Sequence, residues 1–178
     1  MYKTVKQSRI EISQLMLPSH TNFGGKIHGG YILSLMDQIA FSCASKHSGS
    51  YSVTASVDKV NFLNSIDVGE LVTMKASVNF VGNSSMVIGI RVEAENIQTG
   101  KTKHCNSSYF TMVAVDKKSK PVTVPGLHIL NNEELRRYLK AIQRAEESKI
   151  RNEVFSDKNF SHEKYTEELK NYRVKLDL

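Results

Sequence analysis

A single apolar run near the start of the chain, from Gly30 to Ala44, constrains the fold more than any other feature. Its apolar residues recur at intervals of three and four and also fill positions between, a pattern typical of a helix buried on most sides. The pattern predicts that this helix ends before the turn-rich cluster His47–Ser50. The apolar members are Ile32, Leu33, Leu35, Met36, Ile39, Ala40, Phe41 and Cys43.

Strand patterns lie on both sides of this helix in the sequence, and no second helical pattern separates those that follow it. In these segments apolar residues tend to alternate with polar ones, which indicates strands with one buried face and one polar face. Long antiparallel strands after one buried helix predict an α+β fold in which a curved sheet wraps around the helix. The predicted strand segments are 9–15, 53–62, 72–80, 86–94 and 109–115.

One carboxylate, Asp37, interrupts the apolar helix, and it is the only acidic residue between Lys26 and Lys46. It lies about two turns past the glycine pair, too deep to cap the helix or to feel its dipole strongly. A carboxylate in apolar surroundings costs free energy unless another group pairs with it or uses it. Asp37 is therefore a candidate catalytic group, and the alternative is a structural carboxylate inside a subunit interface.

The segment before the helix is rich in glycine and carries Asn22. Gly29 and Gly30 let backbone N–H groups approach a ligand, because no Cβ stands in the way. At a helix start these groups lack internal partners and suit a carbonyl oxygen that becomes negative during acyl transfer. Asn22 can donate to the same oxygen or orient a water, although an asparagine here also suits a turn.

These residues also carry a resemblance to a known family. Asn22-Phe23-Gly24, His28-Gly29-Gly30, Asp37, Ser56-Val57-Asp58 and Asn61-Phe62 resemble the motifs of the hotdog-fold acyl-CoA thioesterases. Within that family the chain is most similar to bacterial acyl-CoA hydrolases related to brain acyl-CoA hydrolase. The similarity covers roughly Arg9 to Gly126, and the spacing from Asn22 through Gly29 to Asp37 is its most specific part.

The resemblance implies a hotdog fold and hydrolysis of fatty acyl-CoA to free fatty acid and CoA. It implies that the N–H of Gly29, with Asn22, stabilises the oxyanion. Asp37 would either deprotonate water or attack the carbonyl carbon to form a mixed anhydride, and the sequence leaves both routes open. The family also implies a dimer in which Asn22 and Gly29 of one chain meet Asp37 of the other, assembled further into a hexameric trimer of dimers.

Further residues are expected to bind substrate rather than to react. His28 and Gly30 are expected at the pocket wall, and Ser56 matches a strand serine that in some relatives helps to place the attacking water. In relatives the region of the Gly82–Ser85 turn contacts the CoA nucleotide. Turn N–H groups and hydroxyls can hold phosphate, but Gly82-Asn83-Ser84-Ser85 is equally typical of a solvated hairpin turn.

Composition narrows the remaining classes of partner. The six histidines are scattered without paired ligand spacing, so we expect no metal and no cofactor beyond CoA as part of substrate and product. The first 127 residues carry 13 Lys and Arg against 8 Asp and Glu, which accounts for +5 of the net charge of +6. This excess can attract an anionic ligand, or it can be a solvated surface. No signal peptide or membrane-spanning run is visible, so we expect a cytoplasmic protein with no membrane or nucleic-acid partner.

After Pro121 and Pro125 the strand pattern gives way to a charged segment with helical spacing. We therefore predict a hotdog thioesterase domain over 1–127 and a helical extension over 128–178. Asn131 or Asn132 can cap a helix that carries Leu135, Leu139 and Ile142 at helical spacing, and His162–Tyr172 is a second candidate helix. We expect this amphipathic extension to pack within the oligomer.

Two other functions share the expected fold. A hydratase or dehydratase of this fold usually pairs a histidine with a carboxylate, and only His28 lies near the candidate residues. A non-catalytic acyl-CoA sensor of this fold carries a helix-turn-helix domain ahead of the hotdog, and eight residues precede the first predicted strand. The single nearby histidine disfavours a hydratase or dehydratase, and the eight residues before the first predicted strand disfavour a sensor.

Overall fold

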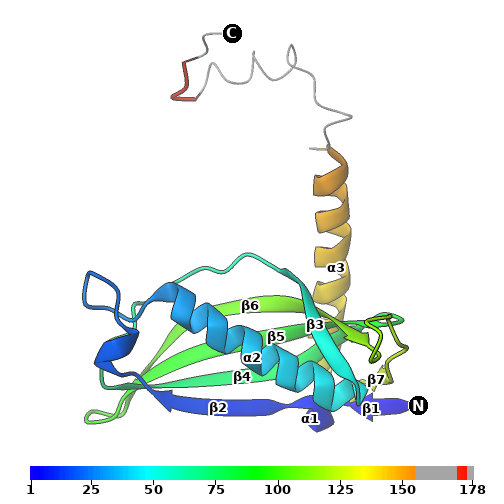
Figure 1. The fold of residues 1–178 in the computed structure, drawn as a ribbon, viewed down its shortest axis with the longest axis horizontal. Helices are drawn as coiled ribbons and strands as arrows, with labels where there is room; N and C mark the ends of the chain where they lie inside the picture. Colours follow the sequence, from blue (N-terminus) through cyan, green and yellow to red (C-terminus); the bar gives the residue numbers. More distant parts are fainter. Residues whose placement is uncertain (155–171, 176–178) are drawn as a thin grey trace. The chain divides into compact units, whose positions relative to one another are not determined.

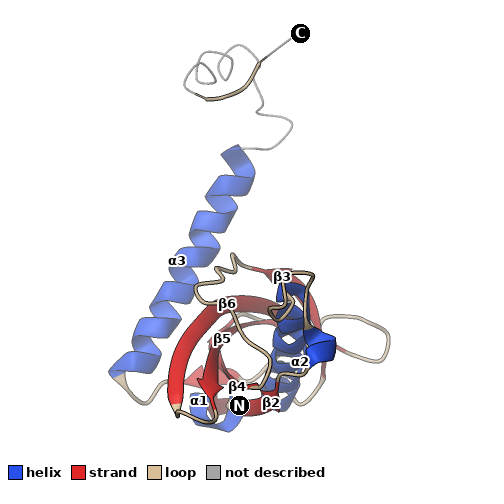
Figure 2. Cartoon of the chain, turned by 90° about the vertical axis from the view of Figure 1, so that its left-hand side faces the viewer, coloured by secondary structure: helices blue, strands red, loops and turns tan. Residues whose placement is uncertain are grey.

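The computed structural model describes residues 1–154 and 172–175, and it divides the chain into two compact units, Met1–Ala141 and Ile142–Leu178. In the first unit a five-stranded antiparallel sheet in the order β2-β4-β5-β6-β3 curls around one long helix, α2 (Figures 1 and 2). This arrangement confirms the predicted α+β hotdog fold. The strands of the sheet are β2 (Ile10–Leu15), β3 (Tyr51–Val57), β4 (Glu70–Val81), β5 (Ser85–Asn96) and β6 (Lys101–Val115), and α2 spans Gly29–Ser48.

Small elements complete the first unit. Strands β1 (Tyr2–Thr4) and β7 (Gly126–His128) pair in parallel as a separate two-stranded sheet. A short helix α1 (Val5–Ser8) follows β1, and a 3-10 turn (Pro18–His20) precedes the glycine-rich loop. The last described helix is α3 (Asn132–Val154).

The sheet follows the alternation of the sequence closely. In β4, Val72, Met74, Ala76 and Val78 point into the core, and they pair with buried residues of β5. The opposite face carries polar side chains such as Thr73 and Lys75, as predicted. Strand β6 begins at Lys101, eight residues earlier than predicted. The first half of β6 is polar and shows no alternation of apolar residues. Its pairing with β5 keeps it in the strand conformation.

Helix α2 differs from the prediction in two respects. It continues to Ser48 and ends at Gly49, whose φ of 74° is the left-handed conformation typical of a glycine C-cap. It is also not buried on most sides, because Ser34, Asp37 and Gln38 form an exposed strip within the single chain. Apolar periodicity shows that a helix face avoids water, but it does not show whether the same chain covers that face. The buried residues are Ile32, Met36, Ile39, Ala40, Cys43, Ala44 and His47.

Helix α3 begins with an asparagine side-chain N-cap, as predicted. The side-chain Oδ1 of Asn131 accepts a hydrogen bond from the N–H of Glu134 at 2.9 Å, so Asn131 rather than Asn132 is the N-cap. Glu134 in turn pairs with Arg9 at 3.2 Å. The candidate helix His162–Tyr172 falls outside the described residues except for Tyr172. The proposed boundary after Leu127 stays a prediction, because compactness alone does not mark where a catalytic domain ends.

His47 ties the end of α2 to the segment before β7. Its ring is fully buried and its Nε2 lies 2.9 Å from the carbonyl oxygen of Pro125. The Nζ of Lys3 donates to the backbone carbonyl of His47 at 2.6 Å. This tertiary contact explains why the helix continues past the predicted end. Burial lowers the pKa of His47 below its ordinary value of 6.5, so the folded chain holds the ring neutral.

We expect the free energy of unfolding to decrease as the pH falls below the ordinary value of 6.5 for His47. The unfolded chain then binds a proton that the folded chain excludes, which gives a slope of at most about 1.4 kcal/mol per pH unit. Urea denaturation between pH 5 and 8, at fixed protein concentration, measures this slope. His47→Gln should flatten the slope and His128→Gln, at an exposed position, should not. Equal slopes for wild type and His47→Gln would contradict the assignment.

Candidate functional site

Asp37 lies on the exposed strip of α2 and faces strand β3. The hydroxyl of Thr54 in β3 donates to Oδ1 of Asp37 at 2.6 Å. The same hydroxyl lies 3.4 Å from Sδ of Met112, which is fully buried. The predicted burial of the carboxylate is wrong for the single chain, since Asp37 is exposed. Thr54 therefore fixes one oxygen of a carboxylate that water or a ligand can still reach.

The Asp37 carboxylate lines a groove of about 500 Å³. It runs between α2 and β3, so that helix side chains form one wall and strand side chains the other. The Ser52 hydroxyl, in the strand wall, is buried and has no partner among the residues that the structure describes. The lining residues are Asp37, Gln38, Phe41, Ser42, Tyr51, Ser52, Val53, Thr54 and Met112.

Asn22 shapes the loop that leads into α2. Its Oδ1 accepts hydrogen bonds from the N–H groups of Gly24 at 2.9 Å and Lys26 at 3.2 Å. Its backbone N–H donates to the carbonyl of Lys26 at 2.8 Å. The oxygen is thus committed to the turn, and within the described part of the chain the Nδ2 group has no acceptor. Asn22 serves the turn and still presents an amide donor.

The first turn of α2 leaves one N–H group without a partner. His28 is the N-cap, and its Nδ1 accepts from the N–H of Gly30 at 2.9 Å. The N–H groups of Tyr31 and Ile32 donate to the carbonyl of His28. The N–H of Gly29 has no acceptor in residues 1–154 and 172–175. Of the two predicted glycines, Gly29 is therefore the available donor, and His28 has a capping role.

The ring of Phe62 lies over Gly29 and limits what can replace it. A Cβ built on Gly29 would lie 3.2 Å from Cζ of Phe62, which is tighter than an ordinary contact. A Cβ on Gly30 would lie 2.7 Å from Cε1 of His28. Both glycines thus have a packing reason for lacking a side chain, in addition to any role in binding.

The structure does not bring the predicted catalytic groups together within one chain. Gly29 and Asp37 are eight residues apart on the same helix, which corresponds to about 12 Å along its axis. An oxyanion donor and the group that attacks or activates water must both lie within about 3 Å of one acyl group. We therefore treat Gly29 with Asn22 (the Gly29 half) and Asp37 with Thr54 (the Asp37 half) as two separate candidate groups in the single chain.

Strand β3 lies at the edge of the sheet, next to the Asp37 half. It pairs with β6 on one side, and its other side has no strand partner in the part of the chain that the structure describes. Tyr51, Val53 and Val57 are exposed along it. An exposed, apolar edge strand is a template for pairing with another chain.

Ser56, the strand residue expected to help place the attacking water, makes no hydrogen bond to Asp37 within the described residues, and its expected role stays a prediction. The register between β3 and β6 shifts between Thr54 and Ser56, and Ser56 is exposed. Thr54 donates to the carboxylate, and the sequence reasoning missed this residue. The only signal would have been a second hydroxyl in the same strand, two residues earlier.

The Gly82–Ser85 turn connects β4 to β5, as predicted. The N–H of Gly82 donates to the carbonyl of Ser85 at 2.8 Å. The carbonyls of Asn83 and Ser84 accept from the N–H groups of Val124 and Ala114, both at 2.9 Å. These bonds hold the turn against neighbouring segments. Contact with a CoA phosphate stays a prediction.

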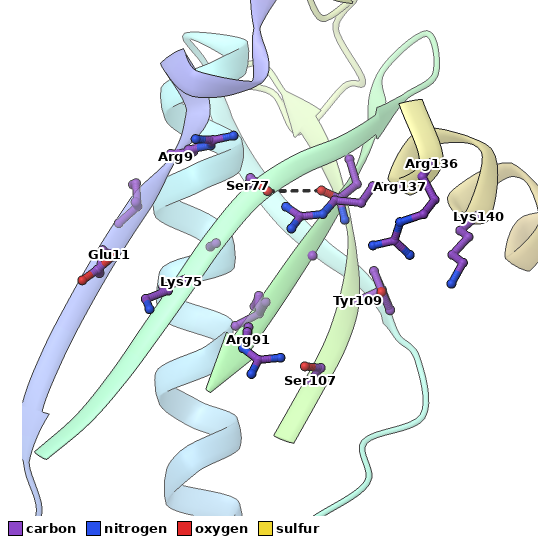
Figure 3. A pocket seen from close by; sticks show the side chains of 15 residues that line it. Arg9, Glu11, Lys75, Ser77, Arg91, Ser107, Tyr109, Arg136, Arg137 and Lys140 are labelled. Carbon is purple, nitrogen blue, oxygen red and sulfur yellow. Dashed lines mark hydrogen bonds between the residues drawn. The ribbon is translucent and has the colours of Figure 1, made fainter. Parts of the chain in front are cut away.

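A larger groove of about 620 Å³ lies on the opposite face of the sheet and contains none of the candidate catalytic residues (Figure 3). Six cationic side chains from the sheet, its flank and α3 surround it, and five of them form ion pairs with three carboxylates. Glu93 pairs with Lys75 at 2.7 Å and Arg91 at 2.8 Å, and these cations lower its pKa. Hydrogen bonds from Arg136 and, to a lesser extent, from Arg137 lower the pKa of Glu133 to about 2. We interpret this surface as a solvated ion-pair network.

Other reactive groups do not form a second centre. Burial raises the pKa of the Cys43 thiol to about 12, so it does not act as a nucleophile. Among residues 1–154 and 172–175 there is no cluster of three or more His, Cys, Asp or Glu side chains that could hold a metal ion. Within the same residues no helix is long and apolar enough to cross a membrane.

Comparisons with known proteins agree with this fold. A family model described as thioesterase superfamily matches residues 24–101. Protein VdlD of Helicobacter pylori is 41% identical over 143 residues, covering 80% of this chain and 82% of that protein. The uncharacterized acyl-CoA thioester hydrolase YkhA of Bacillus subtilis is 36% identical over 146 residues, covering 82% and 85%.

Solved structures extend the likeness to three dimensions. An apo-hexameric acyl-CoA thioesterase is 39% identical with a TM-score of 0.82, covering 84% of this chain and 96% of that one. An acyl-CoA hydrolase from Staphylococcus aureus, solved with butyryl coenzyme A and coenzyme A, is 31% identical with a TM-score of 0.80, covering 97% and 100%. Variants of that hydrolase that replace an aspartate, a threonine and an asparagine with alanine have also been solved. The identities and coverage show that this chain is a hotdog-fold acyl-CoA thioesterase.

Proposed function

We propose that this thioesterase hydrolyses fatty acyl-CoA to free fatty acid and CoA at a site that two chains assemble. The observation that carries the proposal is the hydrogen bond from Thr54 to Asp37 in an open groove. The variants of the S. aureus hydrolase support it. In that protein the aspartate follows the asparagine by 15 positions and the threonine follows the aspartate by 17. Asp37 follows Asn22, and Thr54 follows Asp37, at the same intervals.

In the proposed reaction Thr54 holds Oδ1 of Asp37, which leaves Oδ2 free to act on the thioester. In one route Oδ2 removes a proton from water, whose oxygen attacks the carbonyl carbon. In the other Oδ2 attacks the carbon itself, and water later hydrolyses the mixed anhydride. In both routes the carbon–sulfur bond breaks and CoA leaves as a thiolate, which needs no metal ion.

Negative charge develops on the carbonyl oxygen in either route. The unpaired N–H of Gly29 at the positive end of the α2 dipole is a suitable donor for that charge. The Nδ2 group of Asn22 is a second donor, and the bonds to Gly24 and Lys26 fix its direction. Because these donors are already ordered, little free energy is needed to align them during the reaction.

We propose that the second chain joins through the free edge of β3, forming a dimer and then a trimer of dimers. The separation of about 12 Å between Gly29 and Asp37 supports this assembly, because one chain alone cannot apply both groups to one thioester. A two-fold axis at the β3 edge would give each dimer two identical sites. The hexameric state of the similar thioesterase is consistent with this.

The remaining predicted contacts belong to substrate binding. We propose that His28 and Gly30 line the entrance, that Ser56 lies near the attacking water, and that Gly82–Ser85 contacts the CoA phosphates. We propose no resident cofactor, since CoA enters as part of the substrate and leaves as product. A cytoplasmic location stays a prediction. A histidine–carboxylate pair for a hydratase is not favoured, because Nδ1 of His28 is committed to Gly30.

The direct test is release of free thiol from a panel of short, medium and long acyl-CoAs. The proposal expects turnover that depends on enzyme concentration, together with the matching fatty acid as product. Tight binding of acyl-CoA with no thiol released from any member of the panel would overturn it. That outcome would favour a non-catalytic acyl-CoA sensor.

Replacing Thr54 with valine tests its role beside Asp37. Valine keeps the shape but cannot donate to the carboxylate, so we expect kcat to fall about 10- to 100-fold, the value of one charged hydrogen bond. KM should change little, because Thr54 contacts Asp37 rather than CoA. Thr54→Ser restores the hydroxyl and should recover most of the activity. A Thr54→Ser enzyme as slow as Thr54→Val would instead indicate a packing role.

A further inference from the structure

We propose that Phe62 is a positioning residue for the Gly29 N–H group, because its ring shields one side of this donor from water. The inference rests on the proposed function, since it takes Gly29 as a donor to the acyl oxygen. Phe62 belongs to the sequence motifs that resemble the family, but the site described above gives it no part in the reaction. The inference assigns it one that requires no contact with the reacting atoms.

The ring of Phe62 meets Gly29 with its outer edge. The nearest atoms to a Cβ built on Gly29 all belong to this ring, with Cζ at 3.2 Å, Cε1 at 3.4 Å and Cε2 at 3.8 Å. Gly29 is only partly exposed, whereas His28 and Gly30 on either side of it are exposed. The ring thus covers one side of Gly29, and the remaining exposure leaves room for an acyl oxygen.

Backbone hydrogen bonds on both sides of Phe62 hold its segment against β6. Before it, the N–H of Asp58 donates to the carbonyl of Tyr109 at 2.9 Å. Directly after it, the N–H of Leu63 donates to the carbonyl of Cys105 at 2.8 Å. The segment between β3 and β4 has no regular secondary structure, yet these bonds fix the place from which the ring extends.

The same segment is also bonded to the chain just before α2. The N–H of Ile27 donates to the carbonyl of Ile66 at 2.9 Å, and the Lys26 ammonium pairs with the Asp67 carboxylate. Figure 1 shows this segment returning from β3 past the first turn of α2 to reach β4. The contact between Phe62 and the start of the helix is therefore set by bonds on both partners.

A side chain beside the donor changes how the N–H group meets the substrate. A solvated N–H group binds water, which must leave before the group can donate to the acyl oxygen. The attraction between the N–H and the negative charge that develops on this oxygen also increases when the surroundings are less polar. We therefore expect the ring to strengthen the hydrogen bond of Gly29 in the transition state.

The first measurement is kcat and KM for acyl-CoA hydrolysis by Phe62→Ala, with folding and assembly checked by circular dichroism and gel filtration. We expect kcat to fall about tenfold, less than the ~10²–10³-fold that follows the loss of a whole donor. KM should change little, because the ring acts on the donor rather than on CoA. Phe62→Met keeps a long apolar side chain and should recover most of the activity.

A double-mutant cycle tests whether Phe62 acts through the Gly29 N–H. Gly29 is the first helical residue after the N-cap His28, a position that accepts proline, and the ψ of 127° at His28 suits a residue before proline. Gly29→Pro removes only the N–H group and should lower kcat by ~10²–10³-fold. Gly29→Ala adds the same Cβ but keeps the N–H, so it should lose much less.

The decisive comparison is Phe62→Ala in the wild-type and Gly29→Pro backgrounds. If the ring acts through the donor, Phe62→Ala should cause no further loss of kcat once the donor is absent. A general structural role would give the same fold loss in both backgrounds.

Leu63→Ala is the matched control, because Leu63 is the next residue of the same segment and is 59% exposed, close to the 52% of Phe62. This variant should keep wild-type kcat. A wild-type kcat in Phe62→Ala, a change confined to KM, or an equal fold loss in the Gly29→Pro background would each overturn the inference and leave the proposed function standing. A wild type that releases no thiol from any acyl-CoA would overturn the proposed function itself, and the inference with it.

Discussion

Asp37→Asn is expected to lower kcat for acyl-CoA hydrolysis by about 10²–10⁴-fold, the usual contribution of a positioned acid or base. Asparagine has nearly the same shape as aspartate and can still accept the hydrogen bond from Thr54. It cannot remove a proton from water or form a mixed anhydride. The loss should therefore appear in kcat, while the affinity for CoA, measured by calorimetry, should stay close to that of wild type.

Asp116→Asn is a matched control for this substitution. Oδ1 of Asp116 accepts from the N–H groups of Lys118 and Lys120 in a turn, and an asparagine oxygen can do the same. We expect this variant to keep wild-type kcat. An Asp37→Asn enzyme with at least a tenth of wild-type kcat would contradict both proposed routes, since each requires the carboxylate.

The sheet was predictable because its residues follow a simple rule. In β4 and β5 every second residue faces the core, and the register pairs Val72 with Ala94 and Met74 with Val92. This alternation with a period of two can be seen in the sequence alone. The early part of β6 carries no such period, and its strand conformation depends on bonds to β5. It could be found only from the structure.

The end and the exposure of α2 were missed for related reasons. A hydrophobicity pattern treats His47 as a polar residue, but in the structure its ring is buried against the carbonyl of Pro125. A hydrophobicity pattern treats Asp37 as buried, because its neighbours along the helix are apolar, yet among the residues that the structure describes its side chain is exposed. Both errors arise because local periodicity contains no information about which distant segment, or which other chain, covers a given face.

The candidate site was predictable only in part. Asn22, Gly29 and Asp37 stand out as residue types that are unusual for their local setting, and the family resemblance gave them roles. Thr54 has no such signal, because threonine is ordinary in a strand. Its place beside Asp37 depends on the packing of β3 against α2 and on the register shift that follows it.

Mixing two inactive variants should restore activity if each site takes one half from each chain. Asn22→Ala removes a donor from the Gly29 half, and Asp37→Asn inactivates the carboxylate half. In a mixed dimer one site contains both defects and the other contains neither. With equal amounts and random pairing, half of the dimers are mixed, so about a quarter of wild-type sites should be intact in a two-fold dimer.

The variants are unfolded and refolded together, or coexpressed with different tags, and thiol release is compared with each variant alone. Mixing Asp37→Asn with Thr54→Val is the matched control, because both changes affect the same half of the site. In that mixture every site that contains an intact Asp37 also carries the Thr54→Val substitution, so activity should not exceed that of Thr54→Val alone. No gain in the first mixture, with mixed dimers demonstrated by the tags, would mean that Asn22 and Asp37 of a single chain act on the same thioester. The distance of about 12 Å from Gly29 to Asp37 along α2 argues against that outcome.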